Sequence, residues 1–183
     1  MKGLFYWVSN RLRWSFWVGW AQHYLSQFAV AAFGGMAVTS RLSAKLFKAD
    51  GSVTNLGVLG YRSVTTAFVT FVVDQLQTET SVFGDFKFHD SGVGTTAENI
   101  TDTTMETTDG ESRATGTQTE SAANAYRSVG TISYTTTKAI TEHGLFNDAT
   151  TGTLMDRTVF SAVNVVNGDS IQFTYTLTIS AGG

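Results

Sequence analysis

Residues 168–180, GDSIQFTYTLTIS, decide the fold class. Apolar and polar residues alternate along this stretch: one set is Ile171, Phe173, Tyr175, Leu177 and Ile179, and the other is Gln172, Thr174, Thr176 and Thr178. A period of two is typical of a β-strand that turns one face to the core and the other to water. The turn-forming residues 167–169 precede it. We therefore predict a strand whose first set is buried and whose second set is solvated.

The same alternation occurs much earlier in the chain. In residues 41–48, RLSAKLFK, the side chains on one face are apolar: Leu42, Ala44 and Leu46. Both residues of Asp50–Gly51 tolerate positive φ, so this pair predicts a hairpin turn to a partner strand in residues 53–64. Further strands are expected in residues 81–92, 112–120, 124–137, 138–146 and 152–166.

Two stretches are less regular. Residues 65–76, TTAFVTFVVDQL, form the most apolar run of the chain, and their β-branched content favours a buried strand, with a helix through residues 74–79 as the alternative. Residues 90–112 are too polar for a core and predict a surface excursion. Within that excursion, Thr95 and Glu98 have the spacing of a capping box, which predicts a short helix.

About eight short strands, separated by turns rich in Gly, Asn, Asp and Ser, predict an all-β fold: an antiparallel, jelly-roll-like β-sandwich. Threonine, a β-branched residue, supports this class, since it makes up 29 of the 183 residues. The absence of cysteine excludes a disulfide framework, a thiolate metal site and a cysteine nucleophile. A net charge of -3 argues against a nucleic-acid-binding protein.

The beginning of the chain differs from the rest. All four tryptophans lie within the first 20 residues, and residues 1–49 carry six basic and no acidic residues. Residues 50–183 carry six basic and fifteen acidic residues, so +6 and -9 give the net charge of -3. We predict an aromatic, basic extension in residues 1–35, helical or disordered, and a β-sandwich domain in residues 36–183.

Several interpretations of the extension stay open. The run from Trp14 to Ser40 lacks acidic and basic residues, and it fits a helix that spans or lies on a membrane, anchored by residues 14–38. It also fits a helix that packs on a partner subunit. In a third interpretation, residues 1–35 have no fold of their own and Met36 is an alternative start of translation. We expect a chain that begins at Met36 to fold, to be as stable as the full chain and to be more soluble.

Few residues suggest a catalytic or metal-binding role. The best candidates are His89–Asp90 and Glu142–His143, two pairs that would offer a metal ion two nitrogens and two oxygens if they converged. Adjacent residues on a strand point to opposite faces, so the two members of each pair cannot easily bind the same metal ion. We therefore expect no metal site, and we expect each histidine to lie at a turn and to hydrogen-bond to the backbone. No phosphate-binding loop or nucleophile motif is present. The sequence therefore predicts no catalytic residue, no cofactor and no enzyme activity.

Two further features of the polar stretch are weaker still. It contains an acidic cluster, Asp102, Glu106, Asp109 and Glu111. Carboxylates bind calcium when their spacing along the sequence is that of a calcium-binding loop. The spacing here matches no such loop, so we expect a solvated acidic surface. Asn99 begins a formal glycosylation motif, Asn-Ile-Thr, which is short enough to occur by chance.

The C-terminal part of the chain resembles a recurrent type of small structural protein of tailed bacteriophages. The resemblance covers about residues 41–183 and is carried by YRSVGTISYT (126–135), AITEHGLFN (139–147), GTLMDRTVFSAVNVVNGDSIQFTYTLT (152–178), FKFHDSGVGTTAEN (86–99) and the final Gly182–Gly183. It implies a β-sandwich located in the virion, of the tail-fibre, collar, head-fibre or capsid-decoration type. It implies no catalytic residues, and residues 1–35 lie outside it.

We therefore expect a non-enzymatic structural component of a tailed-phage virion, a tail or collar appendage or a capsid decoration. It would act by symmetric assembly, as a homo-oligomer and with other virion proteins, and without a nucleic-acid partner. One alternative is a host-surface or carbohydrate-binding module that uses loops at one end of the sandwich, although the absence of tryptophan from residues 36–183 disfavours it. The other alternative is a membrane-associated protein anchored by residues 14–38.

Overall fold

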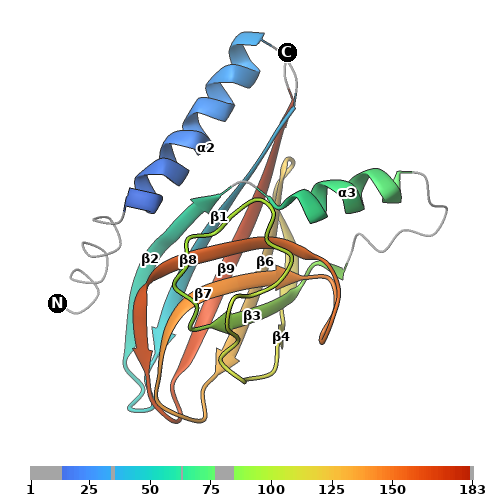
Figure 1. Ribbon diagram of the computed structural model, residues 1–183. Helices are drawn as coiled ribbons and strands as arrows, with labels where there is room; N and C mark the ends of the chain where they lie inside the picture. Colours follow the sequence, from blue (N-terminus) through green and yellow to red (C-terminus); the bar gives the residue numbers. More distant parts are fainter. Residues whose placement is uncertain (1–13, 34–35, 63, 77–84, 182–183) are drawn as a thin grey trace.

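The computed structural model describes residues 14–33, 36–62, 64–76 and 85–181 (Figure 1). Two antiparallel sheets pack face to face, which confirms the all-β sandwich. The first sheet has the order β2-β1-β9-β6-β5, with β1 (Met36–Phe47), β2 (Val53–Arg62), β5 (Thr117–Ala122), β6 (Ala125–Ser133) and β9 (Ser170–Ala181). The second has the order β4-β3-β7-β8, with β3 (Phe88–Gly92), β4 (Ala114–Thr115), β7 (Lys138–Phe146) and β8 (Leu154–Val165).

Strand β9 forms the centre of the five-stranded sheet. It pairs with β1 on one side and β6 on the other, so that Phe173 lies between Ala44 and Gly130. The alternation predicted for it is confirmed for the buried residues Ile171, Phe173, Tyr175 and Leu177. It is wrong for Ile179, which is 43% exposed. That end of β9 pairs with the start of β1 and extends beyond the opposing sheet, so nothing from that sheet covers it (Figure 1).

The hairpin between β1 and β2 forms as predicted. Gly51 has a φ of 83°, a conformation that residues with a Cβ rarely adopt. The amide of Ser52 donates to the Asp50 carboxylate at 2.8 Å, which closes the turn. Leu42, Ala44 and Leu46 of β1 are all buried, so this strand presents the predicted face to the core.

Residues 65–76 form a helix, α3 (Thr66–Gln75), and the strand predicted there is wrong. Thr65 caps the helix, because its hydroxyl oxygen accepts a hydrogen bond from the amide of Phe68 at 3.2 Å. The inward residues follow a helical spacing: Phe68, Phe71 and Val72. Val69 and Val73 face solvent. Packing and the cap therefore override the strand preference of β-branched residues. Residues 77–79 of the alternative helix lie outside the described residues.

The polar stretch between β3 and β4 is a loop without the predicted helix. Glu98, the expected capping residue, instead forms an ion pair with Arg62 of β2. The loop crosses the outer face of the four-stranded sheet and covers a small apolar cluster, Met105, Phe146 and Leu154 (Figure 1). The main core lies between the two sheets. Of the strand expected in residues 81–92, the structure has β3, and residues 81–84 lie outside the described residues.

Residues 14–33 form helix α2 (Trp14–Phe33), which packs on the outer face of the five-stranded sheet at β2. Phe16 is buried, and its ring lies 6.1 Å from that of Tyr61. Gly19 allows this close approach, since a Cβ there would collide with the Tyr61 carbonyl oxygen. This part of the extension therefore has a partner within its own chain. Neither described helix has the length and apolar character needed to cross a membrane.

We predict that Phe173→Ala lowers the free energy of unfolding by about 3–5 kcal/mol, because it empties a fully buried aromatic site. The neighbouring Thr174→Ala should cost well under about 1 kcal/mol, since its side chain lies on the outer face of the sheet. Urea unfolding of both variants measures the difference. Equal losses would contradict the register of β9.

We also predict that the chain without residues 1–35 still unfolds cooperatively. The main core cluster is built from residues between Leu42 and Leu177, so it does not depend on side chains of α2. Thermal unfolding followed by circular dichroism, compared with the full chain, tests this. A shortened chain without a cooperative transition would show that α2 is required for the fold.

Candidate functional site

The structure brings the two predicted histidines together and separates them from their carboxylates. Strands β3 and β7 are neighbours in register, with Ser91 opposite His143. His89 Nδ1 lies 2.9 Å from His143 Nε2, on the inner face of the sheet. Asp90 and Glu142 point to the outer face, as the alternation on each strand requires. The set of two nitrogens and two oxygens considered from the sequence is therefore not assembled.

The histidine pair links the two sheets. His89 Nε2 lies 2.8 Å from the hydroxyl oxygen of Ser128 on β6, in the opposite sheet. His143 packs against Phe173 of β9, with ring centroids 4.5 Å apart. Gly130 leaves the space for the His89 ring, because a Cβ there would overlap it. Both histidines lie in the core and bond to side chains, so the expectation of turn positions bonded to backbone is wrong.

Burial determines the charge of this pair. It lowers the pKa of His89 to about 3. Burial, and then the neighbouring His89, lower the pKa of His143 well below its ordinary value. Both rings are therefore neutral at pH 7, and each contact joins one N–H or O–H donor to one acceptor. Across the described residues, no three or more His, Asp and Glu side chains lie together as ligands for a metal ion.

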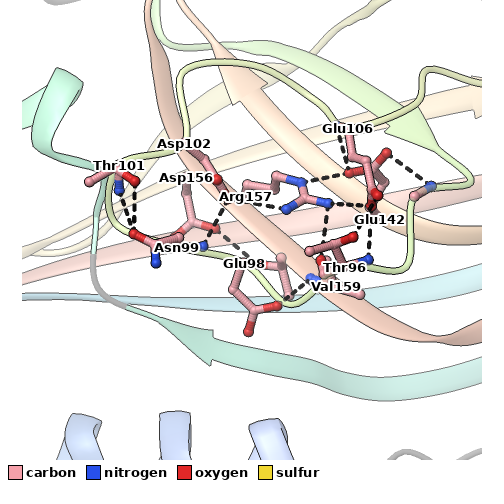
Figure 2. A network of polar contacts seen from close by, with 12 residues as sticks. Thr96, Glu98, Asn99, Thr101, Asp102, Glu106, Glu142, Asp156, Arg157 and Val159 are labelled. Carbon is pink, nitrogen blue, oxygen red and sulfur yellow. Dashed lines mark hydrogen bonds and ion pairs between the residues drawn. The ribbon is translucent and has the colours of Figure 1, made fainter.

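A second polar cluster lies on the outer face, around Arg157 of β8 (Figure 2). Arg157 Nε donates to Glu142 at 2.6 Å, Nη1 donates to Asp102 at 3.1 Å, and Nη2 donates to Glu106 at 3.2 Å. Glu142 is fully buried and also accepts hydrogen bonds from the backbone amides of Gly94, Glu106 and Thr107. These contacts attach the loop to the sheet.

The acidic cluster is solvated only in part: Glu106 is exposed as predicted, whereas the side chains of Asp109 and Glu111 are largely covered. Asp102 and Glu106 bind Arg157, whereas Glu111 accepts a hydrogen bond from Lys138 Nζ at 2.7 Å. Ser91 donates to Asp109. The remaining predicted carboxylate, Asp90, pairs with Arg113 Nε at 3.0 Å, and burial raises the pKa of Asp90 against the opposing effect of that arginine.

A cavity of about 440 Å³ lies between α2 and the loop, beside the Arg62–Glu98 ion pair. Its walls include Val18 and Gln22 of α2, Asn99 and Ile100 of the loop, and Arg157. It combines apolar surface with amide, guanidinium and carboxylate groups. This composition suits a small polar ligand with some apolar surface.

Asp156 forms a third polar group, inside the sandwich. Ser40 of β1 donates to Asp156 Oδ2 at 2.5 Å, and Thr158 donates to Oδ1 at 2.9 Å. Burial raises the pKa of Asp156 to about 6. Sequence reasoning missed Asp156, Arg157 and Arg62. The first two form an adjacent charged pair within the apolar run LMDRTVF, and that pair was the available signal.

We predict that Arg157→Met lowers the free energy of unfolding by about 3–5 kcal/mol, because the buried Glu142 carboxylate loses its cation. Arg127→Met is the matched control. Arg127 is half-buried and donates to Thr119, so its loss should cost less than about 1 kcal/mol. Chemical unfolding of the two variants gives both values. A small effect at Arg157 would mean that the loop is held by other contacts.

We predict that the protein loses stability as pH falls below 6.5. The histidine pKa values are lowered in the folded state, so the unfolded state binds more protons in that range. Each histidine contributes a loss of about 1.4 kcal/mol per pH unit. The raised pKa of Asp156 has the opposite sign and offsets about one histidine between pH 6 and 4.

Unfolding free energies measured at several pH values between 7 and 4, for the wild type and for His143→Asn, test this dependence. The variant should show a shallower slope, because it retains one of the two buried imidazoles. An identical slope in both proteins would show that the histidine pair does not cause the acid sensitivity.

Comparison of the chain with known proteins identifies no relative. No protein-family model matches the chain, and no curated protein matches it.

Proposed function

We propose that this chain is a non-enzymatic structural component of a tailed-phage virion, a tail or collar appendage or a capsid decoration. The resemblance of residues 41–183 to small phage structural proteins supports the proposal. So does the use of the charged groups described above: Arg157, Glu142 and their partners bind one another and hold a long loop against the sheet. Charged groups that are used within the chain in this way suit a structural protein that must keep its shape in an assembly.

The observation that carries the proposal is the difference between the sheet edges. Strand β8 is closed by side chains and backbone: the amide of Thr65 donates to the Met155 carbonyl at 2.9 Å, and Glu98 accepts from the amide of Val159 at 3.3 Å. Strand β5, in contrast, pairs only with β6 among the described residues, and its side chains are mostly exposed. Strands β5 and β8 are edge strands at opposite sides of the sandwich, and the open edge at β5 favours assembly by addition of a neighbour's strand there.

Purified virions test the proposal directly. Peptides of this chain should appear when the proteins of the particle are digested and analysed by mass spectrometry. Particles that contain no such peptide, although infected cells do, would contradict the structural role.

Hydrogen exchange then tests the assembly mode. Amides of β5 should exchange faster in the isolated chain than in the particle. Amides of residues 154–159 in β8 are the control, because that edge is closed within the chain and should be protected in both states. Equal exchange of β5 in the two states would contradict strand addition there.

A second candidate function is a host-surface or carbohydrate-binding module, and the cavity beside Arg62 favours it. The amides of Gln22 and Asn99 and the carboxylate of Glu98 are groups that can bond to sugar hydroxyls. A glycan array probed with the full chain tests this candidate. Binding that is lost in Asn99→Ala would support it, and no binding to any glycan would contradict it.

A further inference from the structure

Helix α2 carries a row of exposed aromatic side chains on the side that does not pack on β2. Trp17, Trp20 and Tyr24 are 42%, 37% and 52% exposed. Their rings form a continuous series, with centroids 5.8 Å apart for the first pair and 4.8 Å apart for the second. Val18 and Leu25 extend this apolar surface around the helix. A large exposed apolar patch of this kind marks a site of interaction.

The sheet face on which α2 lies carries cations. On β9 the even-numbered residues point outward, so their cross-strand neighbours do as well: Arg41 and Arg127 flank Thr176, and Lys45 lies opposite Gln172. The other outward residues of the described strands in this sheet are hydroxyl, amide or apolar residues, and none is acidic. Arg41 lies close to α2, because this cation, after burial, lowers the pKa of His23.

Aromatic and basic groups on one side are the chemistry of a protein that lies on an anionic lipid surface. Tryptophan and tyrosine favour the headgroup region of a bilayer, where one part of the ring is apolar and another is wet. Lysine and arginine beside them are attracted to the negative surface of anionic lipids. The sequence agrees with this polarity, since residues 1–49 carry six basic and no acidic residues.

A second copy of the chain fits this face less well. In a symmetric dimer the same patch meets itself, so Arg41 and Lys45 would approach the cations of the partner without a carboxylate between them. Like charges in such an interface are unfavourable. An anionic surface supplies the missing charge.

We propose that α2 and the adjoining outer face of β1 and β9 dock on an anionic lipid bilayer. The helix lies along the surface with Trp17, Trp20 and Tyr24 in the headgroup region, while Arg41 and Lys45 face the lipid phosphates. The contact is peripheral and reversible, and it uses no group of the buried polar clusters. This binding is separate from assembly through β5, so the two are tested independently.

Flotation of the full chain with vesicles tests the proposal. The protein should float with vesicles made of equal parts phosphatidylglycerol and phosphatidylcholine, and much less with phosphatidylcholine alone. Added salt should weaken the binding, since it screens the attraction of the cations. Failure to float with the anionic vesicles would overturn the proposal.

Two double variants identify the surface. Trp17→Ser with Trp20→Ser should abolish flotation, and Arg41→Gln with Lys45→Gln should lower the partition coefficient about fivefold for each cation removed. Val69→Ser with Val73→Ser is the matched control, because these residues are 51% and 50% exposed on the other described helix. The control should float like the wild type.

Circular dichroism melting of each variant shows that the fold is kept, which is expected because the replaced side chains are exposed. Equal losses in the control and the aromatic variant would overturn the assignment to α2. Sedimentation tests whether a second copy of the chain, instead of a lipid surface, binds this face. A dimer that the aromatic double variant dissociates, together with no flotation of the wild type, would assign the face to a second copy and overturn the proposal.

Discussion

The buried ion pair between Glu142 and Arg157 is the interaction on which the outer layer of the molecule depends. A carboxylate without solvent is costly unless a cation and hydrogen-bond donors surround it. Glu142 obtains the cation from β8 and its donors from backbone amides of the loop between β3 and β4, so the path of the loop follows from the position of one side chain. The glycine at position 94 belongs to this arrangement, because a Cβ there would press on the Glu142 carboxylate.

The loop also determines which residues of the four-stranded sheet are buried. Once covered, the four-stranded sheet is buried on both faces, and every residue of β8 from Leu154 to Phe160 is buried. Alternation is a signal only where one face of a strand meets water, so β9 and β1 could be predicted in detail from sequence. Strand β8 could be located, but its inward and outward residues could not be told apart.

Helix α3 was missed for another reason: the cap at Thr65 and the spacing of its inward residues agree with a helix, but the β-branched composition favoured a strand.

The histidines show where sequence reasoning about a site ends. Strand geometry correctly separates His89 from Asp90 and Glu142 from His143. It cannot say that β3 and β7, more than 45 residues apart in the chain, lie side by side in a register that joins the two imidazoles. That pairing depends on the whole topology, as does Ser128, which reaches the same cluster from the opposite sheet. The ion pairs of the acidic loop could not be predicted for the same reason, because the cations that bind its carboxylates, Arg157 and Lys138, come from strands that follow the loop in the chain.

The division of charge between the two faces explains why the net charge is a poor guide to partners here. Residues 50–183 carry an excess of acidic residues, yet many of these carboxylates are bound to cations or backbone amides, or are buried, around the loop. The cations Arg41 and Lys45 are exposed on the opposite side, where the described strands present no outward carboxylate. A partner that approaches the five-stranded sheet therefore meets a basic surface on an acidic protein. Which face makes contact, more than the total charge, determines the chemistry of the partner.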